Sequence, residues 1–69
     1  MSTKKVIELL AESKKSWEDA AQKAVDDASK SLRGVASIYI KDLSAHVDKD
    51  KITTYRITAK ITFEVEGTK

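Results

Sequence analysis

The segment from Ile52 to Val65 limits the fold of this chain more than any other feature, because apolar and polar residues alternate along most of it. Successive side chains of a β-strand point to opposite faces, so this alternation predicts one long strand with a dry face and a wet face. The apolar series comprises Tyr55, Ile57, Ala59, Ile61, Phe63 and Val65, and the polar series comprises Thr54, Arg56, Thr58, Lys60, Thr62 and Glu64. The dry face of such a strand needs a second layer to cover it.

A predicted helix over residues 17–33 can supply that layer. Its apolar residues recur at the helical period, at Trp17, Ala20, Ala21, Ala24, Val25, Ala28 and Leu32. Ser16 is a suitable N-cap, Asp19 stands where an acid can complete a capping box, and Gly34 can serve as the C′ residue. Trp17 is expected to anchor the core or an interface, with stacking on a ligand as the alternative.

Two further strands are predicted on either side of the helix. Lys5–Leu10 forms a short first strand, and a polar connection from Ala11 to Lys15 follows it. Val35–Val47 forms the second strand, and its apolar phase slips by one residue near Lys41, which indicates a β-bulge. The polar turn at residues 48–51 joins this strand to the third.

The order of elements predicts an α+β fold of β-α-β-β type. The simplest arrangement is a three-stranded antiparallel sheet of order 1-3-2 wrapped on one amphipathic helix. A chain of 69 residues has room for a single domain, which we place over residues 1–69.

The small size of the chain predicts self-association. A single core below roughly 70–80 residues rarely supplies more than about 3–5 kcal/mol of stability. The chain has no cysteine and one histidine, so a disulfide is excluded and a structural metal is poorly supported. We therefore expect a homo-oligomer whose copies complete one another's cores.

Few residues could carry catalysis. The one histidine, His46, lies on an alternating strand without an evident orienting partner. The serines lack a Gly-x-Ser-x-Gly elbow, and no glycine-rich phosphate loop is present. We assign no catalytic residue and expect no enzyme. The net charge of +2 is too balanced for a nucleic-acid partner, and no apolar run could span a membrane, so we expect neither partner and a cytoplasmic location.

Asp48 and Asp50 are an acidic pair with ligand-like spacing. Calcium accepts several carboxylate oxygens, and alternate residues of a loop can converge on one ion. Lys49 and Lys51 interleave with them, however, and no bidentate Glu follows. A solvated turn is therefore the expected state, and we assign no metal ligand. A calcium ion would require several copies to meet at an oligomer axis.

Together these segments resemble the dodecin family, and the resemblance covers nearly the whole chain. It rests on Lys5–Leu9, Ser16–Ala21, Ala24-Val25, Ala28, Ser31–Arg33, Thr54–Arg56 and Ile61–Val65. Dodecins are hollow homododecamers in which a three-stranded sheet wraps one helix, and many store or sequester flavins between aromatic rings. The resemblance implies binding, storage or sequestration of a small molecule, with FMN, riboflavin or FAD as the candidate cofactor.

The residues that hold flavin in the family are replaced in this chain. A tryptophan that stacks on the isoalloxazine ring corresponds to Ser37, and a glutamine that contacts the polar ring edge corresponds to Arg56. The resemblance implies that Ser37 and Arg56 line the ligand pocket and that flavin binding is weakened. Arg56 could still pair with a phosphate or carboxylate. The alternative is a structural or calcium-linked oligomer without an organic ligand.

Overall fold

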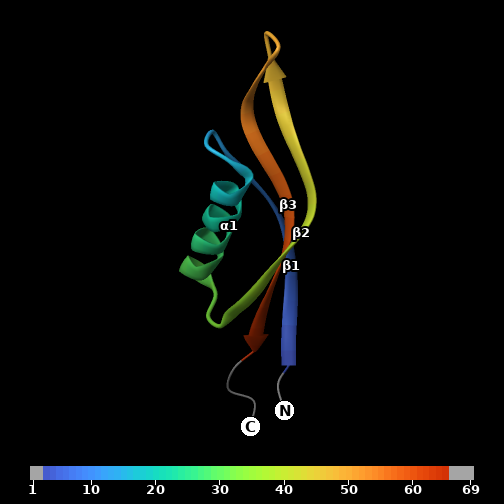
Figure 1. Cartoon of the computed structure of the whole chain (residues 1–69). Coiled ribbons are helices and arrows are strands. Elements are labelled where there is room, and N and C mark those ends of the chain that lie inside the picture. The colour runs from blue at the N-terminus through green and yellow to red at the C-terminus, as the bar shows by residue number, and fades with distance from the viewer. Residues whose placement is uncertain (1–2, 66–69) are drawn as a thin grey trace.

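The computed structural model describes residues 3–65 and contains one helix and three strands. The elements are β1 (Thr3–Ser13), α1 (Trp17–Ser31), β2 (Val35–Asp48) and β3 (Lys51–Val65). The strands form one antiparallel sheet of order β1-β3-β2, and α1 lies against one face of it (Figure 1). The predicted fold class, element order and strand order are confirmed.

Strand β1 is longer than the sequence predicts. It continues past Leu10 to Ser13, through residues that we assigned to a polar connection. The added residues pair with β3: Ala11 lies opposite Ile57, Glu12 opposite Arg56 and Ser13 opposite Tyr55. Pairing with a long central strand gives their backbone groups hydrogen-bond partners, and this tertiary effect outweighs their local polarity.

The β2–β3 hairpin matches its predicted bounds within one residue at each end. The expected bulge is present as a register shift between Ile40 and Asp42. Lys49 and Asp50 form the turn, and both have positive φ, at 52° and 68°. Positive φ at both central residues is typical of a type I′ turn, whose twist matches that of the flanking strands.

The start of α1 agrees with the sequence in its N-cap but not in its capping box. Ser16 Oγ accepts a hydrogen bond from the Asp19 N–H at 2.9 Å. The Asp19 carboxylate instead accepts from Ser13 Oγ at 2.5 Å and lies 3.4 Å from Lys23 Nζ. Asp19 therefore ties the helix to the end of β1.

The end of α1 differs from the prediction by two residues. The helix stops at Ser31, and its C-cap residue, Leu32, is extended. Gly34 has a φ of 72°, but Arg33 separates it from the cap, so it is not the C′ residue. Its carbonyl accepts from the Glu64 N–H at 2.9 Å, so Gly34 sets the path of the chain into β2.

The core lies between α1 and the middle of the sheet. Its buried apolar residues are Ala20, Ala24, Ala28, Ile57, Ala59 and Ile61. Alanine lets the helix approach the strands closely but buries little area per side chain. No residue of β2 is fully buried, and the hairpin extends well past the helix (Figure 1). The core of one chain is therefore small.

Candidate functional site

Both predicted site residues lie on the sheet face opposite to α1. The alternation along β3 points Ile57, Ala59 and Ile61 at the helix, so the intervening residues face away from it. We call this second surface the open face. On β3 it comprises Arg56, Thr58, Lys60, Thr62 and Glu64. Ser37 joins it because Ser37 pairs with Thr62.

Ser37 and Arg56 do not meet within one chain. Ser37 is opposite Thr62, which is six residues along β3 from Arg56. At about 3.3 Å per residue, this spacing separates the two sites by roughly 20 Å. A single small pocket could contain both side chains only if they came from different copies of the chain.

Arg56 forms an ion pair within the chain. Its Nε donates to Glu12 Oε2 at 2.9 Å, and the arginine side chain remains about one-third exposed. Its terminal Nη groups have no hydrogen-bond partner among residues 3–65. Arg56 can therefore keep its contact with Glu12 and still donate to an anionic ligand.

Trp17 packs against the core on the helix side of the sheet. Its ring meets Tyr55 edge-to-face, with the ring centroids 4.8 Å apart. Its Nε1 donates to the carbonyl oxygen of Ser44 at 2.8 Å. This arrangement agrees with the predicted anchor role and links α1 to both strands of the hairpin.

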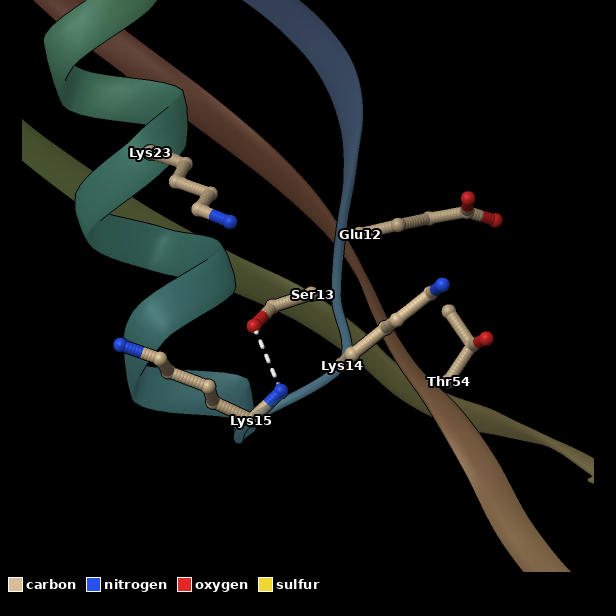
Figure 2. Close-up of a pocket in the computed structure, with 6 residues that line it drawn as sticks. All are labelled: Glu12, Ser13, Lys14, Lys15, Lys23 and Thr54. Carbon is tan, nitrogen blue, oxygen red and sulfur yellow. Dashed lines mark hydrogen bonds between the residues drawn. The ribbon is translucent and has the colours of Figure 1, made fainter.

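A pocket of about 410 Å³, lined by polar and charged residues, lies where β1 passes into α1 (Figure 2). Its lining comprises Glu12, Ser13, Lys14, Lys15, Lys23 and Thr54. Ser13 is 4% exposed, and its Oγ accepts from the Lys15 N–H at 2.9 Å. Lys14 and Lys15 point to opposite sides of the strand in Figure 2, so their charges do not converge on one point. The sequence pattern gave no signal of this pocket, because its lining comes from three separate segments.

The carboxyl group of Asp19, which lies beside this pocket, has a lowered pKa. The hydrogen bond from Ser13 holds the pKa of Asp19 below its usual value, and the Lys23 ammonium acts in the same direction. Partial desolvation acts in the opposite direction and does not reverse the shift. The group is therefore ionised at neutral pH and acts as a structural acceptor.

An apolar groove runs between α1 and β2. One part of it, of about 260 Å³, is lined by Trp17, Glu18, Ala21, Ile40, Leu43 and Ile57. Along the hairpin, Leu43 is 58% exposed and Val47 is 57% exposed, and Ile52 is also exposed. A monomer would leave these apolar side chains in contact with water, which is typical of an interaction surface.

Among the residues that the structure describes, no metal-ligating cluster is brought together. Within residues 3–65, no three side chains of His, Asp or Glu lie close enough to hold an ion. Asp50 lies in the hairpin turn, whereas Asp48 is the last residue of β2 and pairs with Lys51 in the strand register. Calcium takes six to eight oxygen ligands, so these two residues would need ligands from further copies.

In the part of the chain that the structure describes, no helix is both long enough and apolar enough to cross a bilayer.

Comparison with known proteins gives a family for this fold. The dodecin family model matches residues 3–66. The chain belongs to the dodecin family. A protein from Thermus thermophilus superposes with a TM-score of 0.92 at 25% identity, covering 99% of this chain and 100% of that chain. The dodecin of Streptomyces coelicolor gives 0.90 at 21% identity, covering 97% and 96%. A search of curated proteins found no match.

A calcium-binding dodecin is also similar to this chain. The calcium dodecin of Mycobacterium tuberculosis gives a TM-score of 0.81 at 31% identity, covering 99% of this chain and 97% of that chain. It is described as a calcium-chelating antigen with a novel calcium-binding site. Membership of the dodecin family supports small-molecule binding and oligomeric assembly in general.

Proposed function

We propose that this dodecin is a non-enzymatic homo-oligomer, built as a hollow homododecamer, that binds and stores or sequesters a flavin or related cofactor. The observation that carries the proposal is the exposed apolar surface formed by the α1–β2 groove and by Leu43, Val47 and Ile52 of the hairpin. Further copies of the chain would bury this surface and complete a core that is small in one subunit.

The ligand would bind on the open face, at a contact between subunits. Ser37 and Arg56 both lie on this face, but they are too far apart in one chain to hold one small molecule. A subunit contact could place Ser37 of one copy near Arg56 of another. The Nη groups of Arg56 suit a phosphate or carboxylate, which FMN and FAD carry.

Native mass spectrometry of protein taken directly from its host tests the assembly and the ligand together. We expect a dodecamer that retains a small molecule of flavin or nucleotide type. Sedimentation of the same sample at micromolar concentration provides an independent measure of mass. A compact monomer that melts cooperatively would contradict the proposed assembly.

Substitution of Ser37 tests the proposal that flavin binding is weakened. We expect Ser37→Trp to tighten FMN binding by about tenfold, because aromatic stacking is worth about 0.5–1.5 kcal/mol beyond the area that it buries. Ser31→Trp, at the exposed end of α1, is the matched control and should leave the affinity unchanged. Tight FMN binding by the unmodified protein would contradict the role that we give to Ser37.

Calcium-linked assembly is the second candidate, and the 31% identity to a calcium dodecin favours it. A ligand that binds only the folded state raises the melting temperature as its concentration rises above its Kd. If calcium links the subunits, melting curves should shift upward with calcium and downward with EDTA, and Asp48→Asn should reduce the shift. Equal melting temperatures in calcium and in EDTA would remove this candidate.

A further inference from the structure

We propose that Tyr39 and Lys60 form a binding platform on the open face for a planar aromatic ligand that carries a negative charge. The ligand ring would stack on Tyr39, and its anionic group would pair with Lys60. This inference rests on the proposed small-molecule function. It places the stacking contact two residues along β2 from Ser37.

Tyr39 presents an exposed aromatic ring beside Ser37. The register is regular between these two residues, with Ser37 opposite Thr62 and Tyr39 opposite Lys60, so both share the open face. Ile38 lies between them and packs against the core on the other side. Tyr39 is 64% exposed. Within residues 3–65 its ring contacts no other aromatic ring.

Lys60 supplies a positive charge beside that ring. It lies on β3 between Tyr39 of β2 and Glu8 of β1. The Glu8 carboxylate is paired with Lys41 at 3.3 Å, a contact that spans the sheet from β2 to β1. Lys60 itself forms no salt bridge with any residue in the described range 3–65. Because adjacent strands are about 4.8 Å apart, a ring resting on Tyr39 has its edge within reach of the Lys60 ammonium.

The surroundings of this pair favour an extended flat ligand over a small ion. Val6 and Leu10 of β1 are both exposed, and they lie opposite Thr62 and Thr58 on the same face. These side chains add apolar surface to the open face on either side of Lys60. Asp42 lies opposite Thr58, so its negative charge would direct the anionic group of the ligand toward the Ser37 side of Tyr39.

Titrations with FMN and with riboflavin test the platform, because the two ligands differ only by a phosphate. We expect Tyr39→Ala to raise the Kd of both ligands by about tenfold or more, which is the usual effect of losing one stacking ring. Tyr39→Phe keeps the ring and should stay within about threefold of the unmodified protein.

Removal of the lysine charge separates the two contacts. Lys60→Gln should raise the Kd of FMN by about tenfold and leave that of riboflavin unchanged, because a hydrogen bond to a charged group is lost only with the phosphate ligand. Lys30→Gln, on the exposed end of α1, is the matched control and should change neither Kd. Sedimentation of each variant verifies that the oligomer is intact.

Two outcomes would overturn the inference in distinguishable ways. If the unmodified oligomer binds FMN and Tyr39→Ala binds it equally well, the platform is wrong and the proposed function stands. If the unmodified oligomer binds neither FMN nor riboflavin, the flavin part of the proposed function is wrong, and the platform fails with it.

Discussion

At the scale of single residues, Ser13 joins three parts of the chain. It ends β1, accepts from the Lys15 backbone and donates to Asp19 in the first turn of α1. The sequence identified Ser16 as the helix cap because capping depends on residues three positions apart. It did not identify Ser13, because that contact exists only when β1 extends to Ser13 and the chain then turns back.

The lowered pKa of Asp19 predicts a pH-dependent contribution to stability. A carboxyl whose folded-state pKa is lowered stabilises the fold above its unfolded pKa, and this contribution is lost as the pH falls through the folded pKa. The usual value for Asp19 is 3.8. We therefore expect Asp19→Asn to lower the melting temperature at pH 7, and this difference should shrink as the pH falls below about 3.8.

Thermal melts at several pH values, followed by circular dichroism, measure this effect. Asp27→Asn is a suitable control, because Asp27 lies on the same helix in an exposed pair with Lys30 and should give a much smaller difference at pH 7. A pH-independent gap between Asp19→Asn and the unmodified protein would contradict a role for the Asp19 charge.

At the scale of elements, the segment between α1 and β2 depends on Gly34. Its φ of 72° is in the left-handed region, and an added Cβ would lie 3.3 Å from the backbone oxygen of Glu64. We expect Gly34→Ala to lower the free energy of unfolding by about 1–2 kcal/mol, the usual cost of the left-handed conformation for an alanine. Urea denaturation of the variant measures this loss.

A pair of further variants separates backbone strain from crowding at this position. Gly34→Asn also adds a Cβ, but asparagine tolerates positive φ, so it should lose less stability than Gly34→Ala if strain dominates. Ser29→Ala, on the exposed surface of α1, should be nearly neutral. Equal losses for alanine and asparagine would assign the effect to the close contact with Glu64.

The element boundaries were predicted best where the signals are local. The start of α1, the bulge near Lys41 and both bounds of β3 follow from capping, phase and alternation in neighbouring residues. The predicted end of β1 was wrong because pairing with β3, and not the local sequence, determines where that strand ends. Gly34 was assigned to the helix cap, whereas its role depends on contact with Glu64, thirty residues along the chain.

At the scale of the whole molecule, the shape of the chain supports association. The Cα trace extends over 55 × 19 × 13 Å, whereas the fifteen residues of α1 span only about 22 Å at 1.5 Å per residue. One helix therefore cannot cover the whole dry face of the hairpin. The apolar residues beyond the helix stay exposed to water unless another copy of the chain packs on them.

A charge placed on this apolar surface should disrupt the oligomer. Leu43 lies in the α1–β2 groove and is mostly exposed in one chain. Leu43→Lys should therefore leave the fold of the subunit intact but oppose assembly, because an unpaired charge would be buried at each contact and about 1.5–3 kcal/mol of leucine burial would be lost. Sedimentation velocity measures the resulting mass.

Ser29→Lys is the matched control for this change. Ser29 is exposed on α1 and does not line the groove, so the added charge should leave the mass of the oligomer unchanged. An oligomer that survives Leu43→Lys at micromolar concentration would show that the groove is not a subunit contact.

The sequence by itself determined the types and order of the elements, the dry face of β3, and the positions of Ser37 and Arg56 relative to the dodecin pattern. Those features follow from residue periodicity and from side chains that are neighbours in the chain. Only the tertiary structure decided that Ser37 and Arg56 lie far apart on the open face, and that Glu8 pairs with Lys41 and leaves Lys60 without a salt bridge to any residue from 3 to 65. These distances and ion pairs depend on the register of strands that are distant in sequence, and no local pattern encodes that register.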